Sequence, residues 1–144
     1  MKINEDSLYR QIATLARDAI LFADEQGLIR TWNKGAEAIF GYSAAEALGQ
    51  SLELIIPENL RQRHNEGYAA TIQSGHSKYG SDLLSVPAVH KDGHRLFCDF
   101  SIVMIKDDAG KMLGVASIMR DTTAQKAREK EMREKIKSLE PKDN

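Results

Sequence analysis

Residues 32–51 read WNKGAEAIFGYSAAEALGQS, and the fold class of the chain follows chiefly from them. Asn33 and Ser43 carry side chains that accept hydrogen bonds from the free N–H groups at the start of a helix. Gly41 and Gly49 are residues at which helices commonly end, because glycine tolerates the left-handed conformation found there. The pattern therefore predicts two short helices in succession.

Runs that favour strands lie on both sides of this helix pair. Before it, residues 19–23 and 28–33 flank the turn Asp24–Gly27 and predict a hairpin. After it, the turn signals KDG and DDAG separate three strand-like runs, at residues 82–89, 95–105 and 112–119. Alternation within the middle run predicts five side chains that face the core: Leu96, Cys98, Phe100, Ile102 and Met104.

Two further segments have helical spacing. Residues 5–17 predict an amphipathic leading helix that carries Leu8, Ile12 and Leu15, and we expect it to lie against the core or a partner. Residues 58–73 predict a longer helix. Along one of its faces, four residues recur at every fourth position: Leu60, His64, Tyr68 and Ile72.

The chain ends in a charged segment, AQKAREKEMREKIKSLE, that is rich in helix-forming residues. Met132, Ile136 and Leu139 form a narrow apolar stripe on it. The stripe permits two interpretations: an ordinary solvated helix, or a helix that dimerises or passes on a signal. Asp121 lies just before this segment, and we expect its carboxylate to cap the helix.

The composition sets limits on function. The 144 residues, 42% hydrophobic and 28% charged, suit one globular core with a short extension at each end. Twenty basic and 21 acidic residues, without a basic cluster, argue against direct nucleic-acid binding. The single cysteine, Cys98, suits a reducing cytoplasm and is expected to be an inert core residue. No apolar run approaches the ~20 residues of a membrane span, so we expect a cytoplasmic protein that does not bind membranes.

Three motifs in this order resemble the PAS (S-box) sensory domain family. Residues 32–51 resemble its N-x-x-A-E-x-x-F-G-Y core, Lys91–Gly93 its K-D-G hairpin, and Arg120–Thr123 its closing R-D-I-T element. The resemblance implies an α+β fold, in which helices pack on one face of a five-stranded antiparallel sheet and further helices flank the domain. We expect three segments: an amphipathic helix at residues 1–18, the PAS domain at 19–123, and a charged helix and tail at 124–144.

Residues 57–68, PENLRQRHNEGY, are similar to the R-H-x-x-Y stretch of haem-binding PAS domains from bacterial oxygen sensors, with one extra residue between the histidine and the tyrosine. That resemblance implies that His64 ligates haem iron and that Tyr68 lies at the same site. Leu84 aligns with an arginine that stabilises bound oxygen in those sensors, so oxygen is disfavoured as the signal. Phe100 and Ile102 align with apolar positions of the pocket.

Other interpretations of these residues stay open. Without a metal, His64 is a helix histidine packed or hydrogen-bonded under the sheet. Tyr79 is expected at the pocket rim, although a solvated loop is the common alternative. The family comparison argues against flavin, because the helix cluster lacks the reactive cysteine of light-sensing members. His90 and His94 bracket the KDG turn, where we expect them to be exposed and able to meet, with too few other ligands for zinc.

The resemblance implies a bacterial sensory module that binds a small ligand or haem and acts in signal transduction or regulation of transcription. We expect it to form a homodimer and to signal through its terminal helices to a partner such as a kinase or regulator. The alternative is a cofactor-free dimerisation or interaction module. No catalytic arrangement of side chains is legible, so we expect no enzymatic activity. In the alternative, the pocket is filled by its own side chains: Phe22, Phe100, Ile102 and Met104.

Overall fold

The computed structural model describes residues 1–80 and 82–141, so the last part of the predicted tail, residues 142–144, lies outside the described residues. Along the chain, two strands precede the helix cluster and three strands follow it, and one further helix lies at each end. The α-helices and strands are α1 (Glu5–Leu15), β1 (Ala19–Asp24), β2 (Ile29–Trp32), α2 (Lys34–Phe40), α3 (Ala44–Ala47), α4 (Arg61–Ser74), β3 (Leu84–Val89), β4 (Arg95–Lys106), β5 (Met112–Asp121) and α5 (Thr123–Ser138). Two short 3₁₀ helices, η1 (Leu52–Ile55) and η2 (Glu58–Leu60), precede α4.

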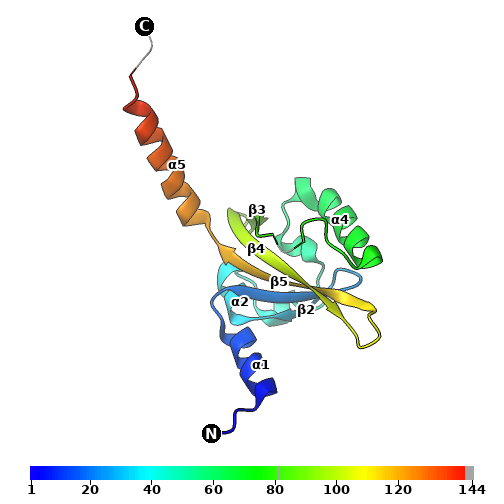
Figure 1. The fold of residues 1–144 in the computed structure, drawn as a ribbon. Coiled ribbons are helices and arrows are strands. Elements are labelled where there is room, and N and C mark those ends of the chain that lie inside the picture. Colours follow the sequence, from blue (N-terminus) through cyan, green and yellow to red (C-terminus); the bar gives the residue numbers. More distant parts are fainter. Residues whose placement is uncertain (81, 142–144) are drawn as a thin grey trace.

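The five strands form one antiparallel sheet in the order β2-β1-β5-β4-β3, so the last strand lies at its centre. The helices α2, α3 and α4 lie to one side of the sheet, whereas α1 and α5 extend away from it (Figure 1). The predicted α+β fold, with its hairpin, helix cluster and three-stranded meander, is confirmed.

The helix pair of residues 32–51 forms through local hydrogen bonds. Asn33 caps α2, because its Oδ1 accepts a hydrogen bond from the backbone N–H of Ala36 at 2.9 Å. The helix ends at Gly41, whose φ of 81° is left-handed. Ser43 and Glu46 then form a reciprocal capping box at the start of α3. The caps and stops read from the sequence therefore agree with the structure.

The core lies between the sheet and the helix cluster. The alternation predicted for β4 is confirmed in its first part, since Leu96 and Cys98 are buried while Phe97 between them is exposed. The other three side chains predicted to face the core, Phe100, Ile102 and Met104, are only partly buried. Burial raises the pKa of the Cys98 thiol to about 12, which agrees with the predicted inert core residue. The largest side chains that are fully buried come from both layers: Phe40, Leu21, Ile29 and Cys98.

Two helix starts differ from the prediction. The helix expected from residue 58 begins instead as the separate 3₁₀ turn η2, and α4 starts at Arg61. The C-terminal helix starts at Thr123, so its N-cap position is Thr122 and not the predicted Asp121. The Asp121 carboxylate nevertheless accepts a hydrogen bond from the Thr123 N–H at 2.9 Å. Asp121, the residue before the N-cap position, therefore satisfies one of the free N–H groups in the first turn of α5.

The leading helix does not lie against the core of its own chain. No side chain of α1, all of which is described, is buried, and Ile12 and Leu15 are 56% and 63% exposed. The end of α1 is held by Asn33, whose Nδ2 donates to the backbone oxygens of Ala13 at 2.8 Å and Asp18 at 3.0 Å. The expectation that this helix lies against the core is therefore wrong, whereas its contact with a partner stays a prediction.

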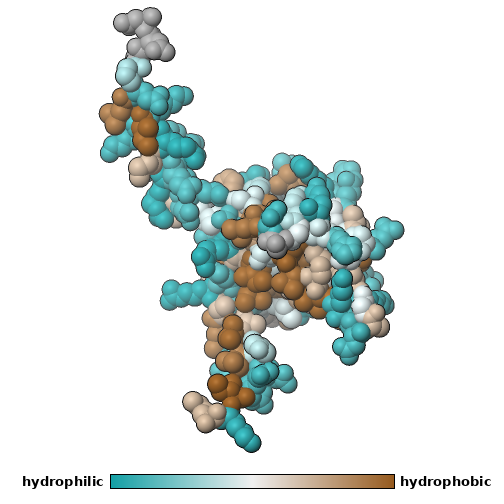
Figure 2. Space-filling model, viewed as in Figure 1, coloured by the Kyte–Doolittle hydropathy of each residue, from teal (hydrophilic) through white to brown (hydrophobic). Residues whose placement is uncertain are grey.

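Apolar side chains also gather on the outer face of the sheet and along α1, as the brown atoms of Figure 2 show. On the sheet they line a shallow, open groove that consists of Phe22, Ile105, Leu113 and Ala116. Leu113 is 42% exposed. We call this surface the outer groove.

Both edges of the sheet are interrupted. On the β2 edge, the loop after α3 pairs with Ile29, whose N–H donates to Gln50 O at 2.8 Å and whose oxygen accepts from the Gly49 N–H at 2.8 Å. On the β3 edge, Pro87 lies within the strand opposite Phe97. A proline has no N–H group to offer at such an edge.

Candidate functional site

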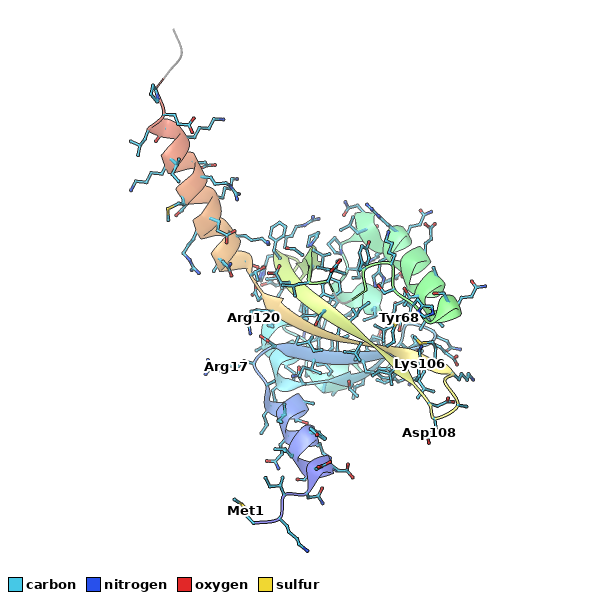
Figure 3. All side chains as sticks on the ribbon, viewed as in Figure 1. Met1, Arg17, Tyr68, Lys106, Asp108 and Arg120 are labelled. Atoms are coloured by element: carbon cyan, nitrogen blue, oxygen red, sulfur yellow. The ribbon has the colours of Figure 1, made fainter. Side chains whose placement is uncertain are left out.

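Tyr68 connects α4 to the turn between β1 and β2. Its hydroxyl lies 2.6 Å from the Asp24 carbonyl oxygen and 3.0 Å from that of Ala23, so it donates to this pair of acceptors. Figure 3 shows Tyr68 where α4 meets the sheet. Burial raises the pKa of Tyr68 to about 12, and the hydroxyl therefore stays protonated as a donor.

A pocket of about 210 Å³ lies beside Tyr68, between α4, the β1–β2 turn and the start of η1. His64, one helical turn before Tyr68, stacks on it with 6.0 Å between ring centroids, so the structure brings these two predicted residues together. The remaining residues of the pocket are mostly polar or small: Glu25, Gln26, Gly27, Ser51, Leu52, Asn65 and Ala69. We call this space the His64 pocket.

Hydrogen bonds orient His64. Its Nδ1 lies 3.3 Å from Asn65 Oδ1, and Asn65 Nδ2 donates to Glu53 Oε1 at 2.8 Å. In the tautomer in which Nδ1 donates to Asn65, Nε2 carries the free lone pair. A histidine held in this way can accept a hydrogen bond from a ligand or coordinate a metal ion.

The other predicted pocket residues lie elsewhere. Leu84 and Phe100 face each other across β3 and β4, and Ile102 lies further along β4, opposite Ser117. Tyr79 is 42% exposed in the loop after α4, where Lys78 Nζ lies 4.9 Å from its ring centroid. None of these four predicted residues lines the His64 pocket.

Haem can be tested against this geometry. The orientation of His64 suits an iron ligand, because a ligating histidine commonly donates its second ring nitrogen to an oxygen. The volume is less suitable, since 210 Å³ is below the ~300 Å³ of typical small-molecule sites. His64 therefore fits as an iron ligand. The pocket is too small for haem as it stands, so entry of haem requires α4 to move away from the β1–β2 turn.

An ion pair that the sequence interpretation missed joins the two ends of the domain. Arg120 binds Asp18 through two hydrogen bonds, Nε to Oδ1 and Nη2 to Oδ2, each 3.1 Å long. Asp18 raises the pKa of Arg120. Asp18 follows α1 and Arg120 is the third residue before α5, so this ion pair joins the end of α1 to the start of α5. We call it the Asp18–Arg120 clamp.

With this geometry established, a comparison with family models matches residues 17–124 to the PAS domain. The chain belongs to the PAS domain family. The match covers most of the chain and includes the sheet, the helix cluster and the clamp. This confirms the resemblance read from the three sequence motifs.

Known relatives agree. The chain is 38% identical over 56 residues to the sensor protein FixL of Bradyrhizobium diazoefficiens, covering 39% of this chain and 11% of that protein. It is 24% identical over 113 residues to the oxygen sensor protein DosP of Escherichia coli, covering 78% of this chain and 14% of DosP. The similarity therefore covers only a small part of these longer proteins. The comparisons thus show that this chain is a PAS sensory domain of the kind found in signalling proteins.

Solved structures show the same fold. The PAS domain of a protein from Colwellia psychrerythraea has a TM-score of 0.74 and 26% identity, covering 84% of this chain and 99% of that one. An RNA-binding light-oxygen-voltage receptor has a TM-score of 0.71 at 22% identity, covering 93% of this chain and 37% of that one. In the part of this chain that the structure describes, no helix has the length and apolar character needed to cross a membrane.

Proposed function

We propose that this PAS domain senses a small ligand in the His64 pocket and that strand β1 transmits the occupancy to the terminal helices. One observation carries the proposal. Asp24 at one end of β1 accepts the Tyr68 hydroxyl, and Ala19 at the other end directly follows Asp18 of the clamp. A strand of six residues, ~20 Å long, therefore joins the pocket to the roots of α1 and α5.

The turn at the pocket end is held by several bonds that a ligand can disturb. Asp24 Oδ1 accepts the N–H groups of Gln26 at 2.9 Å and Leu28 at 3.0 Å, and Asp24 Oδ2 binds Arg30 at 2.7 Å. A ligand that competes for the Tyr68 hydroxyl alters the partners of the same residue. The changed hydrogen bonding at Asp24 then shifts β1 relative to β5. Strand β1 pairs with β5 along its whole length.

Haem is a second candidate, because His64 has the orientation of a metal-ligating histidine and one relative is named as an oxygen sensor. When bound, haem would supply an iron atom that can bind a gas or change its redox state. His64 would hold the iron, and Tyr68 would release the β1–β2 turn to make room. Leu84, which aligns with the oxygen-stabilising arginine of the oxygen sensors, is apolar and lies outside the His64 pocket, so it gives no support to oxygen as the signal.

A hemin titration tests that candidate. Wild-type protein should develop a sharp Soret band at one hemin per chain, and His64→Ala should lose it. His76→Ala is the matched control, because His76 is an exposed histidine outside the pocket. If no band develops, haem is excluded as the ligand. If the band persists in His64→Ala, His64 is excluded as the iron ligand. In the first case the small-ligand proposal depends on other compounds.

Transmission is tested separately, by hydrogen exchange on the terminal helices. A compound that raises the melting temperature in a thermal screen should change amide exchange in α1 and α5. Arg120→Ala should keep the binding and lose the change in α5, whereas Lys34→Ala, which removes an exposed ion pair elsewhere, should keep both. Equal responses in the two variants would contradict transmission through the clamp.

We also propose that the domain forms a homodimer, in which the apolar side of α1 covers the outer groove of a second copy. The support is that both surfaces are apolar and exposed within one chain. Ile12→Glu should convert the dimer to a monomer in sedimentation experiments, and Gln11→Glu on the same helix should not. A monomeric wild-type protein would refute this, as would a dimer that Ile12→Glu leaves intact.

The remaining parts of the proposal concern the partner. We propose that the domain has no catalytic activity of its own and acts on a kinase or regulator in signal transduction or regulation of transcription, in the cytoplasm of a bacterium. We propose neither direct nucleic-acid binding nor a membrane contact. The balanced charge of -1 supports this part of the proposal. If no ligand is found and the dimer persists, a cofactor-free dimerisation module explains the fold better.

A further inference from the structure

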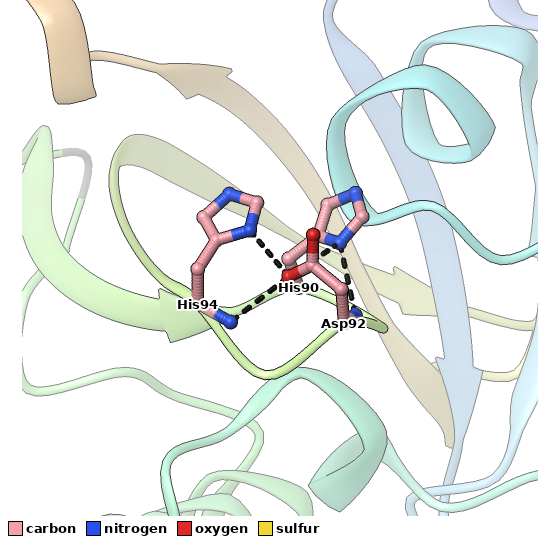
Figure 4. Close-up of side chains that lie close together, drawn as sticks. All are labelled: His90, Asp92 and His94. Carbon is pink, nitrogen blue, oxygen red and sulfur yellow. Dashed lines mark hydrogen bonds and ion pairs between the residues drawn. The ribbon is translucent and has the colours of Figure 1, made fainter.

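The turn between β3 and β4 brings two histidines and an aspartate together, far from the His64 pocket. His90, Asp92 and His94 each offer one ligand atom, and these three atoms lie within 4.8 Å of one another (Figure 4). The two imidazole rings stack, with 4.5 Å between their centroids. We propose that this His-Lys-Asp-Gly-His turn binds a divalent transition-metal ion such as Zn²⁺.

The spacing of the donor atoms suits a metal ion. His90 Nδ1 lies 3.2 Å from Asp92 Oδ1, and His94 Nδ1 contacts the same oxygen. Two ligands at ~2.0–2.1 Å from a tetrahedral zinc ion are separated by ~3.3 Å. The His90 nitrogen and the Asp92 oxygen therefore already have nearly the separation that they need in a zinc site.

The Nδ1 atom of His90 has one lone pair, which accepts the backbone N–H of Asp92 at 3.1 Å. A metal ion that binds at this nitrogen therefore takes the place of the Asp92 N–H. Asp92 Oδ1, 3.2 Å from the same nitrogen, supplies a neighbouring ligand atom.

The turn is held in place before any metal binds. The His90 N–H donates to His94 O at 3.0 Å, and the Lys91 N–H donates to Phe40 O at 2.9 Å. The His90 ring lies against Gly41, where an added Cβ would come within 2.5 Å of the ring. The site thus needs little ordering on binding, which favours affinity.

The surrounding charge does not oppose a cation. Lys91, which lies within the turn, is paired with Glu46, with 2.5 Å between Nζ and Oε2. The side chains of Asp92 and His94 are 61% and 53% exposed, so water can complete the coordination. Two imidazoles and one carboxylate suit Zn²⁺, Ni²⁺ or Cu²⁺, whereas Mg²⁺ and Ca²⁺ require mainly oxygen ligands.

A bound ion would fix the β3–β4 turn to the end of α2, because the same turn bonds to Phe40 and packs on Gly41. This site uses no residue of the His64 pocket and no residue of the clamp. Tests of metal binding at this turn are therefore independent of whether a small ligand or haem binds in the His64 pocket.

Calorimetric titration of the full, untagged chain with zinc sulfate tests the proposal. We expect one Zn²⁺ per chain with a Kd below about 100 µM. His94→Ala and Asp92→Asn should each weaken binding by at least about tenfold, and both positions are exposed, so the variants should fold. His76→Ala should bind as the wild type does, and Mg²⁺ should not bind.

A second measurement reports on the structure. Zn²⁺ should slow hydrogen exchange of the Lys91 amide, which bonds to Phe40, in wild-type protein and not in His94→Ala. The proposal is overturned if Zn²⁺ does not bind at about 100 µM, or if His94→Ala binds it as tightly as wild type. It is equally overturned if His76→Ala abolishes binding, because the ion then lies elsewhere.

Discussion

Replacing Asn33 by alanine should destabilise the protein by about 3 kcal/mol, because this one side chain serves three elements. Its Oδ1 accepts the N–H of Ala36 at 2.9 Å and that of Ile20 at 2.8 Å. Its Nδ2 donates to the carbonyl oxygens of Ala13 and Asp18. The side chain is buried, so alanine leaves these backbone groups without a partner.

The magnitude follows from two contributions. Loss of a helix N-cap costs about 1 kcal/mol. A buried or partly buried N–H or C=O group left unsatisfied costs a further ~1–3 kcal/mol, and we take about 2 kcal/mol for the groups around Asn33. For a chain of 144 residues, the total lowers the melting temperature by roughly 10 °C.

Ser43→Ala separates the two contributions. Ser43 also caps a helix, but it is not fully buried and its Oγ accepts only the Glu46 N–H, at 3.2 Å. We expect a loss of about 1 kcal/mol there. Asn33→Asp keeps the acceptor and removes the donor, so it should fall between the two variants.

Urea unfolding followed by far-ultraviolet circular dichroism measures all three free energies of unfolding. The reasoning is refuted if Asn33→Ala loses no more stability than Ser43→Ala. It is refuted as well if Asn33→Asp is as stable as wild type, because the bonds to the end of α1 then contribute nothing.

Four further predictions concern single sites. Tyr68→Phe should lower the free energy of unfolding by about 1 kcal/mol through loss of its hydrogen bond to the β1–β2 turn; an unchanged urea midpoint would contradict this. Gly41→Ala should cost at least about 1 kcal/mol, because φ is +81° and the new Cβ meets the His90 ring; the same titration measures it. Cys98, with its pKa raised to about 12, should resist iodoacetamide at pH 8 until urea unfolds the protein, and rapid labelling of native protein would disprove its burial. The hydrogen bond from Lys91 lowers the pKa of Glu46 from 4.5 to about 2, so the stabilisation by this pair is present above pH 4.5 and is lost as the pH falls towards 2; Glu46→Gln should therefore lose less stability than wild type between pH 5 and pH 3.

Much of the fold could be predicted from the sequence because its signals are local. As caps and stops, Asn33, Ser43 and Gly41 act on residues within four positions of themselves, and these roles were predicted correctly. The alternation in β4 likewise depends only on the two faces of a strand. These features need no knowledge of which elements meet. The bonds from Asn33 to Ala13, Asp18 and Ile20 span longer distances in the sequence and were not predicted.

The candidate site was predicted less completely, because it depends on contacts between distant elements. Helical spacing put His64 and Tyr68 on one face of α4, and the structure agrees. It could not show that this face meets the β1–β2 turn, because the acceptors there are backbone carbonyls, which have no sequence signature. The clamp joins the side chains of Asp18 and Arg120 across 102 positions, and it was missed because nothing in the sequence shows which distant charged residues meet.

The proposed metal site was predicted in part from the sequence. His90 and His94 were predicted to meet across the hairpin, because residues on either side of a tight turn face each other, and the structure places their rings in a stack. The expectation that both are exposed holds for His94, whereas His90 is partly covered by Gly41. Asp92 was the ligand that the interpretation overlooked, although it lies in the quoted KDG motif.

The interrupted edges of the sheet limit the kind of assembly this protein can build. With Pro87 in β3 and the Gly49–Gln50 loop along β2, neither edge offers a continuous row of free donors and acceptors to another strand. Under the proposed homodimer, association uses side-chain surfaces, α1 and the outer groove, in place of the strand edges. The interruptions therefore disfavour the strand-by-strand addition of copies at either edge, which is the route by which sheets grow into fibrils.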